Sequence, residues 1–414
     1  MSKIGKVYTP LILIIQSNLD QLSEPGGPVL FALWAGRGGG KTTILGLIGE
    51  QSSDLKATTT LGPWDFRLSP SEVLASQVLT AVRVAPNESR KLILLDNLDE
   101  LLRIGDGEPF FTFEREVLRE LVRRGDTLVV VTSRAPLIQW RDYEVRISAR
   151  NLHIPSLSRE DVAEWARERQ LDPDQAFEIS LGHPQVLAWL QEQPNIPPEE
   201  IDRKVADLFL NGISGKTRQL AEVASLFPVF DLAVLRPVLS AEDTESFYSE
   251  YTERLEELLR KGLVFWDGEI GAYRFQESTV RRLLARGALH RDPEQFRRIH
   301  QVAAGYYQQE AQRAAYLHRS LVSALYHTAQ AHLGKGEEAG KMCIQWMESN
   351  LRMWLGAPWE KVLWAWKTGA GDEAIREELQ ALLGPAAFER ITRLLESAAQ
   401  AAAQIFQQAQ EVNR

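Results

Sequence analysis

The chain has 414 residues, of which 44% are hydrophobic and 25% are charged, and its formal net charge is -9. This length allows about two to four domains of ordinary size, and the composition is that of a globular protein, neither disordered nor membrane-embedded. The net charge argues against a protein that coats nucleic acid non-specifically, because such binding depends on Lys and Arg neutralising phosphates.

The single cysteine, Cys343, cannot form an intrachain disulfide, which fits a reducing compartment. Its neighbours Met342 and Ile344 predict a buried thiol. The apolar run 11–15 is too short to span a membrane, and no cleavage site follows it. We therefore expect a cytoplasmic protein that does not use a membrane as a partner.

A glycine-rich loop, residues 35–43, follows an apolar run at 29–34 and precedes the helical pattern 44–48. Strand, glycine loop and helix in this order are the context of a phosphate-binding P-loop. Glycines let backbone N–H groups turn toward phosphates, and the positive end of the helix dipole points to the same place. The alternative is a strand-to-helix turn that binds nothing. We predict that ATP or ADP is bound by Gly36, Arg37, Gly38, Gly39, Gly40, Lys41, Thr42 and Thr43.

Within this loop, Lys41 is expected to reach the β- and γ-phosphates, and the Thr42 hydroxyl is expected to hold Mg2+.

An amphipathic helix is predicted before the loop, at 9–22, followed by a Pro- and Gly-rich break. Further strands are predicted at 56–61, 91–96, 127–132 and 143–147, with helices at 71–84 and 113–124. Strands that alternate with helices imply a mostly parallel sheet covered on both faces, with ligands beyond the carboxyl ends of its strands.

An acidic stretch, residues 96–100, begins where the apolar strand 91–96 ends. A P-loop needs an acid that holds Mg2+ through its water shell and a group that orients the attacking water. Asp96 is the metal-site candidate together with Thr42, and Asp99 or Glu100 is the candidate base, with Asp99 slightly favoured. The alternative is an acidic surface turn.

Arg134 ends the next strand, where a guanidinium can distinguish triphosphate from diphosphate by contacting the γ-phosphate. A solvent-exposed arginine is the alternative, and Arg141 is a second arginine that could project toward a neighbouring subunit.

Gly182-His183-Pro184 alone is a turn between two helices. Beside a nucleotide site it becomes a lid contact, with Pro184 on the adenine and His183 near the phosphates.

After residue 155 the strand signal stops, and Ser158 with Asp161 predicts a capping box at the start of a helix. Helices at 217–226, 232–239 and 244–261, followed by short strands at 263–266 and 272–275, describe a winged helix. We therefore predict a P-loop nucleotide-binding domain at 1–155 (with 1–28 as an N-terminal helix and linker), a helical lid domain at 156–214, a winged-helix domain at 215–288, and an α-helical arm at 289–414, a candidate start of a helical-repeat sensor.

The order of these motifs resembles the STAND class of signal-transduction ATPases, which includes the NB-ARC and NACHT proteins, over roughly residues 29–284. The acidic stretch is closer to the NACHT form. The resemblance implies an α/β P-loop NTPase with an AAA+-like parallel sheet, followed by helical, winged-helix and all-α regions. It also implies a switch that closes on ADP as a monomer and self-associates with ATP and Mg2+ after an inducer binds, with slow hydrolysis and an effector partner.

The chain departs from the family pattern at two positions. Gln276 follows Phe275 where the family often has a histidine that contacts the ADP β-phosphate, and Gln276 can still donate a hydrogen bond there. Ala35 replaces the first glycine of the loop. A recognisable effector domain and a long repeat sensor are missing, so the resemblance implies a fragment or a core that works with other segments.

A DNA-binding ATPase of the replication-initiator type is the alternative, since it also joins a P-loop module to a winged helix. The helix that would enter the major groove, 243–261, carries six acidic and three basic residues, a balance of -3. Because such a helix should be basic, we do not expect DNA as a partner. A nucleotide-binding scaffold with negligible hydrolysis is a third possibility.

Two further clusters in the C-terminal half admit a ligand-binding and a structural interpretation, and for both the structural one is favoured. A helical face or inter-domain contact is expected for Arg281, Arg282, Arg286, Arg291, Arg297 and Arg298. A helical core or docking surface is expected for Trp346, Trp354, Trp359, Trp364 and Trp366.

Overall fold

The computed structural model describes residues 8–22, 29–53, 55, 57–239, 244–313, 317–334, 337–351, 359–369 and 373–412. The chain divides into two compact units, Met1–Ile201 and Asp202–Arg414, and each is described by itself. The four-part division from the sequence is finer than this and stays a prediction.

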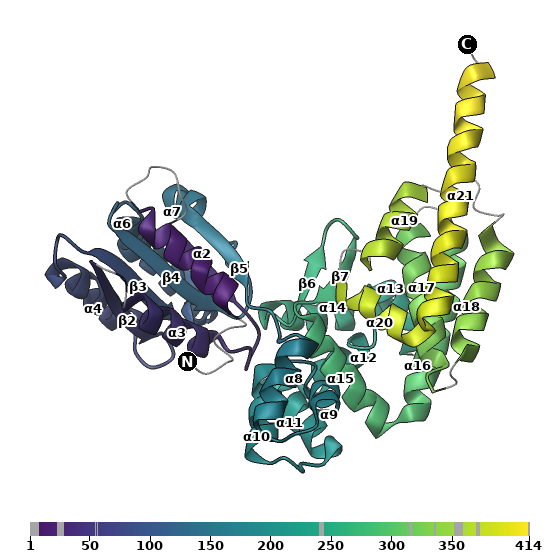
Figure 1. Ribbon diagram of the computed structural model, residues 1–414, viewed down its shortest axis with the longest axis horizontal. Coiled ribbons are helices and arrows are strands. Elements are labelled where there is room, and N and C mark those ends of the chain that lie inside the picture. The colour runs from purple at the N-terminus through teal and green to yellow at the C-terminus, as the bar shows by residue number, and fades with distance from the viewer. Residues whose placement is uncertain are drawn as a thin grey trace. The chain divides into compact units, whose positions relative to one another are not determined.

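A five-stranded parallel sheet forms the centre of the first unit (Figure 1). Its strands are β1 (Leu30–Trp34), β2 (Thr58–Asp65), β3 (Arg90–Asp96), β4 (Thr127–Ser133) and β5 (Ala149–His153). They lie in the order β2-β3-β4-β1-β5, and every neighbouring pair is parallel. Strand β4 is inserted between β1 and β3, so Val130 pairs with Phe31 on one side and Leu94 on the other.

Helices cover both faces of this sheet, which explains why β3 and β4 are almost continuously apolar. Helices α2 (Thr9–Asp20) and α3 (Lys41–Ser53) pack on one face. The side chains of Ile93 and Val129 point to the other face. That face is covered by α4 (Ser71–Val84), α5 (Glu108–Phe113), η3 (Glu114–Leu118), α6 (Arg119–Val122) and α7 (Tyr143–Ser148). The first unit is therefore the predicted α/β P-loop NTPase fold with an AAA+-like sheet.

Three predicted elements differ from the structure. The strand predicted at 143–147 is wrong: this segment is helix α7, capped by the Asp142 side chain, which accepts hydrogen bonds from the N–H groups of Glu144 and Val145. The last strand is β5, which follows it. The helix predicted from residue 113 begins earlier, at Glu108. Strand β2 runs through Gly62 and Pro63 with a shift in register, which an edge strand tolerates.

A helical segment completes the first unit, with α8 (Arg159–Glu168), α9 (Pro173–Ser180), α10 (Pro184–Glu192) and the start of α11 (Pro198–Leu210). The predicted capping box is confirmed, because Ser158 and Asp161 exchange hydrogen bonds at the start of α8. Gly182 has a φ of +77°, and a Cβ at this position would lie 1.9 Å from the carbonyl oxygen of Leu157. Only glycine fits there.

The second unit begins with a winged-helix arrangement. Helices α12 (Gly215–Ala224), α13 (Leu232–Val238) and α14 (Thr244–Arg260) precede an antiparallel pair, β6 (Val264–Asp267) and β7 (Ala272–Phe275). Phe230 forms a further antiparallel bridge with Tyr273 of β7. The helices and strands predicted between residues 217 and 275 are thus confirmed within a few residues.

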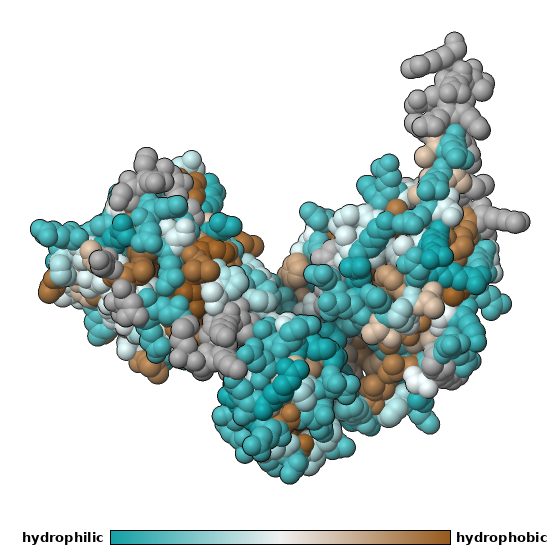
Figure 2. All heavy atoms as spheres, viewed as in Figure 1, coloured by the Kyte–Doolittle hydropathy of each residue, from teal (hydrophilic) through white to brown (hydrophobic). Residues whose placement is uncertain are grey.

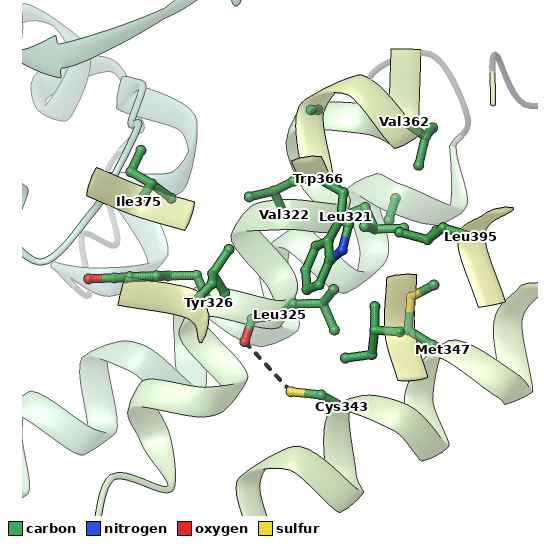
Figure 3. Close-up of a cluster of buried hydrophobic side chains, with 14 of the residues drawn as sticks. Leu321, Val322, Leu325, Tyr326, Cys343, Met347, Val362, Trp366, Ile375 and Leu395 are labelled. Atoms are coloured by element: carbon green, nitrogen blue, oxygen red, sulfur yellow. Dashed lines mark hydrogen bonds between the residues drawn. The ribbon is translucent and has the colours of Figure 1, made fainter. Parts of the chain in front are cut away.

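The rest of the second unit is helical. It contains α15 (Ser278–Arg291), α16 (Pro293–Gln312), α17 (Leu317–Ala331), α18 (Glu337–Asn350), α19 (Trp359–Thr368), α20 (Glu373–Leu383) and α21 (Pro385–Val412). Their core gathers around the buried indole of Trp366 (Figure 3). Trp359 is also buried and Trp346 packs against the same core, which supports the helical-core interpretation for these residues. Trp364 is instead 46% exposed, and Trp354 lies outside the described residues.

The predicted buried thiol is confirmed in the same core. The Cys343 Sγ donates a weak hydrogen bond to the Leu325 carbonyl oxygen over 3.7 Å, and burial raises the pKa of the thiol to about 12.

On the surface of the first unit, apolar side chains gather over α2, where Leu13 is 56% exposed (Figure 2). Within the described ranges, none of the helices combines the length and the apolarity that crossing a bilayer requires.

Candidate nucleotide site

The glycine loop joins β1 to α3, as the sequence predicts. Gly38 and Gly40 have φ values of +71° and +84°, a backbone conformation that favours glycine. The Gly39 N–H donates to the Gly36 carbonyl, and the Ile44 N–H donates to the Gly40 carbonyl to begin the helix. The loop therefore ends at the first turn of α3, and the N-terminus of a helix is a favourable place for an anion.

Lys41, the first residue of α3, folds back over this loop. Its Nζ donates hydrogen bonds of 2.7 Å to the carbonyl oxygens of Ala35 and Gly36, and the residue is 8% exposed. The ammonium group is thus positioned at the loop by the loop's own backbone.

Thr42 and Asp96 meet beside Lys41. The Thr42 Oγ1 donates to the Asp96 Oδ2 over 2.7 Å, and the hydroxyl of Thr132 donates to the other carboxylate oxygen. Asp96 is 2% exposed at the carboxyl end of β3. A hydroxyl and a carboxylate are oxygen ligands of the kind that Mg2+ prefers, so both residues fit the predicted metal site.

The other acidic candidates lie one turn further along, in the 3-10 helix η1 (Leu98–Arg103). Asn97 turns the chain with a φ of +59°, and its N–H donates to the Thr132 Oγ1 over 2.9 Å. Burial raises the pKa of Asp99, which is 8% exposed, although the positive charge of Arg134 acts in the opposite direction.

Arg134 is held between the two acidic residues. It forms an ion pair with Glu100, and its Nε lies 3.9 Å from the Asp99 Oδ2. Burial lowers the pKa of the P-loop residue Arg37, and the positive charge of Arg134 contributes to that decrease. The structure therefore brings Arg134, Asp99 and Glu100 together near the P-loop, and the catalytic roles of the three residues stay predictions.

The predicted lid residues contact the P-loop. A Cβ built on Gly38 would lie 2.6 Å from the Gln185 Cβ and 3.0 Å from the His183 Cε1, and one on Gly40 would lie 3.7 Å from the Pro184 Cγ. Burial lowers the pKa of His183 to about 4, and the nearby charge of Lys41 adds to this effect. His183 is therefore neutral and fully buried where the lid meets the loop.

Sequence reasoning missed three residues of this site. Gln185 directly follows Pro184, and Thr132 lies two positions before Arg134, so nearness in the sequence to a predicted site residue is the available signal for both. Tyr8, just before α2, is 1% exposed, and its hydroxyl would lie 3.5 Å from a Cβ on Gly40. A lone aromatic residue ahead of a helix carries no spacing signal that would have identified it.

Other candidates lie elsewhere in the structure. Gln276 belongs to the second unit, where its N–H donates to the Leu263 carbonyl over 2.9 Å. The Arg141 guanidinium stacks 3.4 Å from the centre of the Phe111 ring. In the basic cluster, Arg281, Arg282, Arg286 and Arg291 form ion pairs with acidic side chains of the second unit, which favours the packing interpretation.

Comparison with known proteins gives likenesses of fold only. No protein-family model matches the chain, and no curated protein matches it. Similar solved structures include Aeropyrum pernix ORC1 in complex with DNA, with 16% identity, a TM-score of 0.34 and coverage of 67% of this chain and 92% of that chain. Another is DnaA from Aquifex aeolicus bound to AMPPCP, with 14% identity, a TM-score of 0.32 and coverage of 74% and 94%.

A third similar structure is Aeropyrum pernix ORC2 in ADPNP-ADP complexes, with 13% identity, a TM-score of 0.36 and coverage of 69% of this chain and 94% of that chain.

The strand order and the phosphate-loop geometry assign the first unit as a P-loop NTPase core, independently of these likenesses. The resemblance to the STAND class rests on sequence motifs alone.

Proposed function

We propose that this chain is an ATP- and ADP-binding conformational switch with slow ATPase activity. The observation that carries the proposal is the convergence of four groups on one P-loop: the Lys41 ammonium, the Thr42–Asp96 pair, the Arg134 guanidinium with its two acids, and the His183-Pro184 lid. These are the groups that phosphate binding, metal binding and hydrolysis need.

The residues of the loop have the right chemistry for a nucleotide. N–H groups at the start of α3 would bind phosphate oxygens, and Lys41 would exchange its two carbonyl acceptors for phosphate oxygens, which form stronger charge-assisted bonds. Thr42 and Asp96 would hold Mg2+. When bound, this ion neutralises charge that develops on the phosphates.

Asp99 and Arg134 have the properties that hydrolysis would use. A carboxylate whose pKa is raised by burial is a stronger base, which favours Asp99 for orienting and deprotonating water. Glu100 is engaged by Arg134, so Arg134 would have to leave this ion pair to contact a γ-phosphate. Because Arg134 would have to change partners before hydrolysis, we expect the reaction to be slow. Slow hydrolysis suits a switch whose ATP-bound state is long-lived.

The lid supports the switching part of the proposal. His183 and Pro184 pack on the loop residues that would touch the phosphates, so a bound nucleotide would meet the lid. In this proposal the γ-phosphate gives ATP a different affinity from ADP for the closed form, and this difference shifts the population of that form. In this proposal ADP favours a closed monomer, and ATP with Mg2+ favours self-association after an inducer binds, leading to an effector. The assignment of Gln276 to the nucleotide belongs to the same proposal and comes from the sequence resemblance alone.

The test is to denature the purified chain, identify any released nucleotide by chromatography, and measure the mass of the native protein by light scattering. We expect retained ADP on a monomer, loss of ADP in Lys41→Ala, and a larger mass after ATP and Mg2+ are added. Lys341→Ala is the matched control, because Lys341 is exposed on α18 in the second unit. If Lys41→Ala binds ADP as tightly as the wild type, the site is wrongly assigned.

A second candidate function is a DNA-binding ATPase of the replication-initiator type. The observation that favours it is the winged-helix arrangement of α12, α13 and α14 with β6 and β7, in which the strand residue Trp266 is 52% exposed. The charges of α14 oppose it. Glu250 and Glu257 are engaged by α12 and its cap, and Glu253 and Glu256 are exposed where a major-groove helix would need cations.

Binding of labelled duplex DNA separates the two candidates. Fluorescence anisotropy is measured at about 50 and about 200 mM salt, since phosphate contacts weaken steeply over this range. The switch proposal predicts no binding at the higher salt. Salt-sensitive binding that is lost in Trp266→Ala would favour the second candidate and overturn the expectation that DNA is not a partner.

A further inference from the structure

Tyr8 places a buried hydroxyl group beside the P-loop. The residue is 1% exposed, its carbonyl accepts the first hydrogen bond of α2, and its hydroxyl would lie 3.5 Å from a Cβ on Gly40. The same hypothetical Cβ would lie 3.7 Å from the Pro184 Cγ. The Tyr8 hydroxyl therefore sits where the P-loop and the lid meet, next to the residue that precedes Lys41.

This hydroxyl has no hydrogen-bond partner among the described residues. Burial raises the pKa of Tyr8 to about 12, and the negative charge of Asp161 acts in the same direction, so the phenol stays protonated at neutral pH. A buried donor without an acceptor costs free energy, and almost all buried hydroxyl groups have a partner. An acceptor that enters the P-loop would supply the partner that the described residues do not.

We propose that Tyr8 is a nucleotide-binding residue whose hydroxyl donates a hydrogen bond to an oxygen of bound ADP or ATP. This inference rests on the proposed function, because it needs a nucleotide in the P-loop. Since the Tyr8 hydroxyl also adjoins Pro184, the bond would form where the closed lid covers the ligand, and it would link α2 to nucleotide binding.

The experiment compares Tyr8→Phe with the wild type in two measurements, the melting temperature without ligand and the dissociation constant of ADP. Phe keeps the ring and removes only the hydroxyl. Because that hydroxyl has no partner in the described part of the chain, we expect the ligand-free melting temperature to stay the same or rise. We expect the dissociation constant of ADP to increase about 3- to 15-fold, the size of one lost hydrogen bond.

Tyr307→Phe is the matched control. Tyr307 is equally buried, but its hydroxyl donates to the Val229 carbonyl over 3.0 Å within the second unit. Its removal should lower the ligand-free melting temperature and leave the ADP dissociation constant within about twofold, the opposite pattern to Tyr8→Phe.

The two failures are distinguishable. If the wild type binds ADP, Lys41→Ala does not, and Tyr8→Phe binds as the wild type does, then the inference about Tyr8 is wrong while the proposed function stands. A Tyr8→Phe variant that is destabilised without ligand and unchanged in ADP affinity would also overturn it. If the wild type itself does not bind ADP, the proposed function and this inference both fail.

Discussion

The hydroxyl of Thr42 and the carboxylate of Asp96 lie 2.7 Å apart, although 54 positions separate them in the sequence. Thr132 holds the second oxygen of the same carboxylate, so α3, β3 and β4 each contribute one group to the contact. The oxygens that would face a metal ion are therefore oriented by the fold before a ligand arrives, which reduces the entropy lost on binding.

Replacing Asp96 by Asn should remove most of the benefit of Mg2+ for ATP binding. Asn keeps the shape of the side chain but loses the negative charge and one acceptor oxygen. We expect ATP affinity with Mg2+ to fall about 10-fold or more, and affinity in EDTA to change little. Titration of the wild type and the variant under both conditions measures this, and an equal Mg2+ effect in the two proteins would exclude Asp96 from the metal site.

Gly38→Ala should disrupt the contact between loop and lid. The new Cβ would meet Gln185 at 2.6 Å with φ at +71°, so we expect a loss of about 1–3 kcal/mol of stability and at least tenfold weaker nucleotide binding. Gly46→Ala in α3 is the control, because a Cβ there meets nothing within 4 Å and alanine should stabilise the helix by about 1 kcal/mol. Chemical denaturation and ADP titration check both variants, and equal behaviour would contradict the packing described.

His183 should make the chain lose stability as the pH falls. Its pKa is lowered from 6.5 to about 4 by burial, so the unfolded chain binds a proton in this window that the folded chain does not. Stability is then complete above pH 6.5 and decreases by about 3 kcal/mol as the pH falls toward 4.

The measurement is the free energy of unfolding against pH for the wild type and His183→Asn. The buried His300 and His327, whose pKa values are also lowered by burial, are present in both proteins, so the difference between the two curves isolates His183. Parallel curves would show that His183 does not titrate as described.

Glu378→Ala should destabilise the second unit strongly. The Glu378 carboxylate pairs with Arg281, whose side chain is 2% exposed, and with Arg282, so its removal leaves a buried positive charge uncompensated. We expect a loss of about 3–5 kcal/mol in chemical denaturation. Glu337→Ala, which breaks an exposed pair with Lys341, is expected to change nothing measurable. A small effect at Glu378 would mean that water reaches Arg281.

The parts of the fold that the sequence predicts well are those in which local pattern and tertiary role agree. Continuous apolar runs ended by polar residues identify β3 and β4, because both faces of these strands are buried. The glycine loop and the residues at the strand ends are predicted for the same reason, since the carboxyl ends of parallel strands converge.

Helix α7 shows how the pattern fails. Tyr143, Val145 and Ile147 alternate with charged residues, which is the period of a strand. In the structure only Val145 is buried, while Tyr143 is 64% and Ile147 is 61% exposed. A strand would place the three on one face, but the Asp142 cap begins a helix that turns only Val145 toward the core.

The sequence does not indicate Tyr8 as a site residue, for a different reason. Its place in the site depends on how α2 packs beside α3, which no spacing within the first 40 residues encodes. Contacts that arise only from tertiary packing leave no periodic or motif signal in a single sequence.

The order of the strands has a consequence for the nascent chain. Strand β1, which carries the P-loop, pairs through Leu30 with Val129 of β4 and with Ala149 of β5. Val129 follows Thr43, the last residue of the loop, by 86 residues, and Ala149 follows it by 106. Both partners are therefore synthesised well after the loop, and such long-range pairing forms late. A chain released before residue 127 would carry the whole P-loop motif and still lack the two strands that flank β1 in the finished sheet.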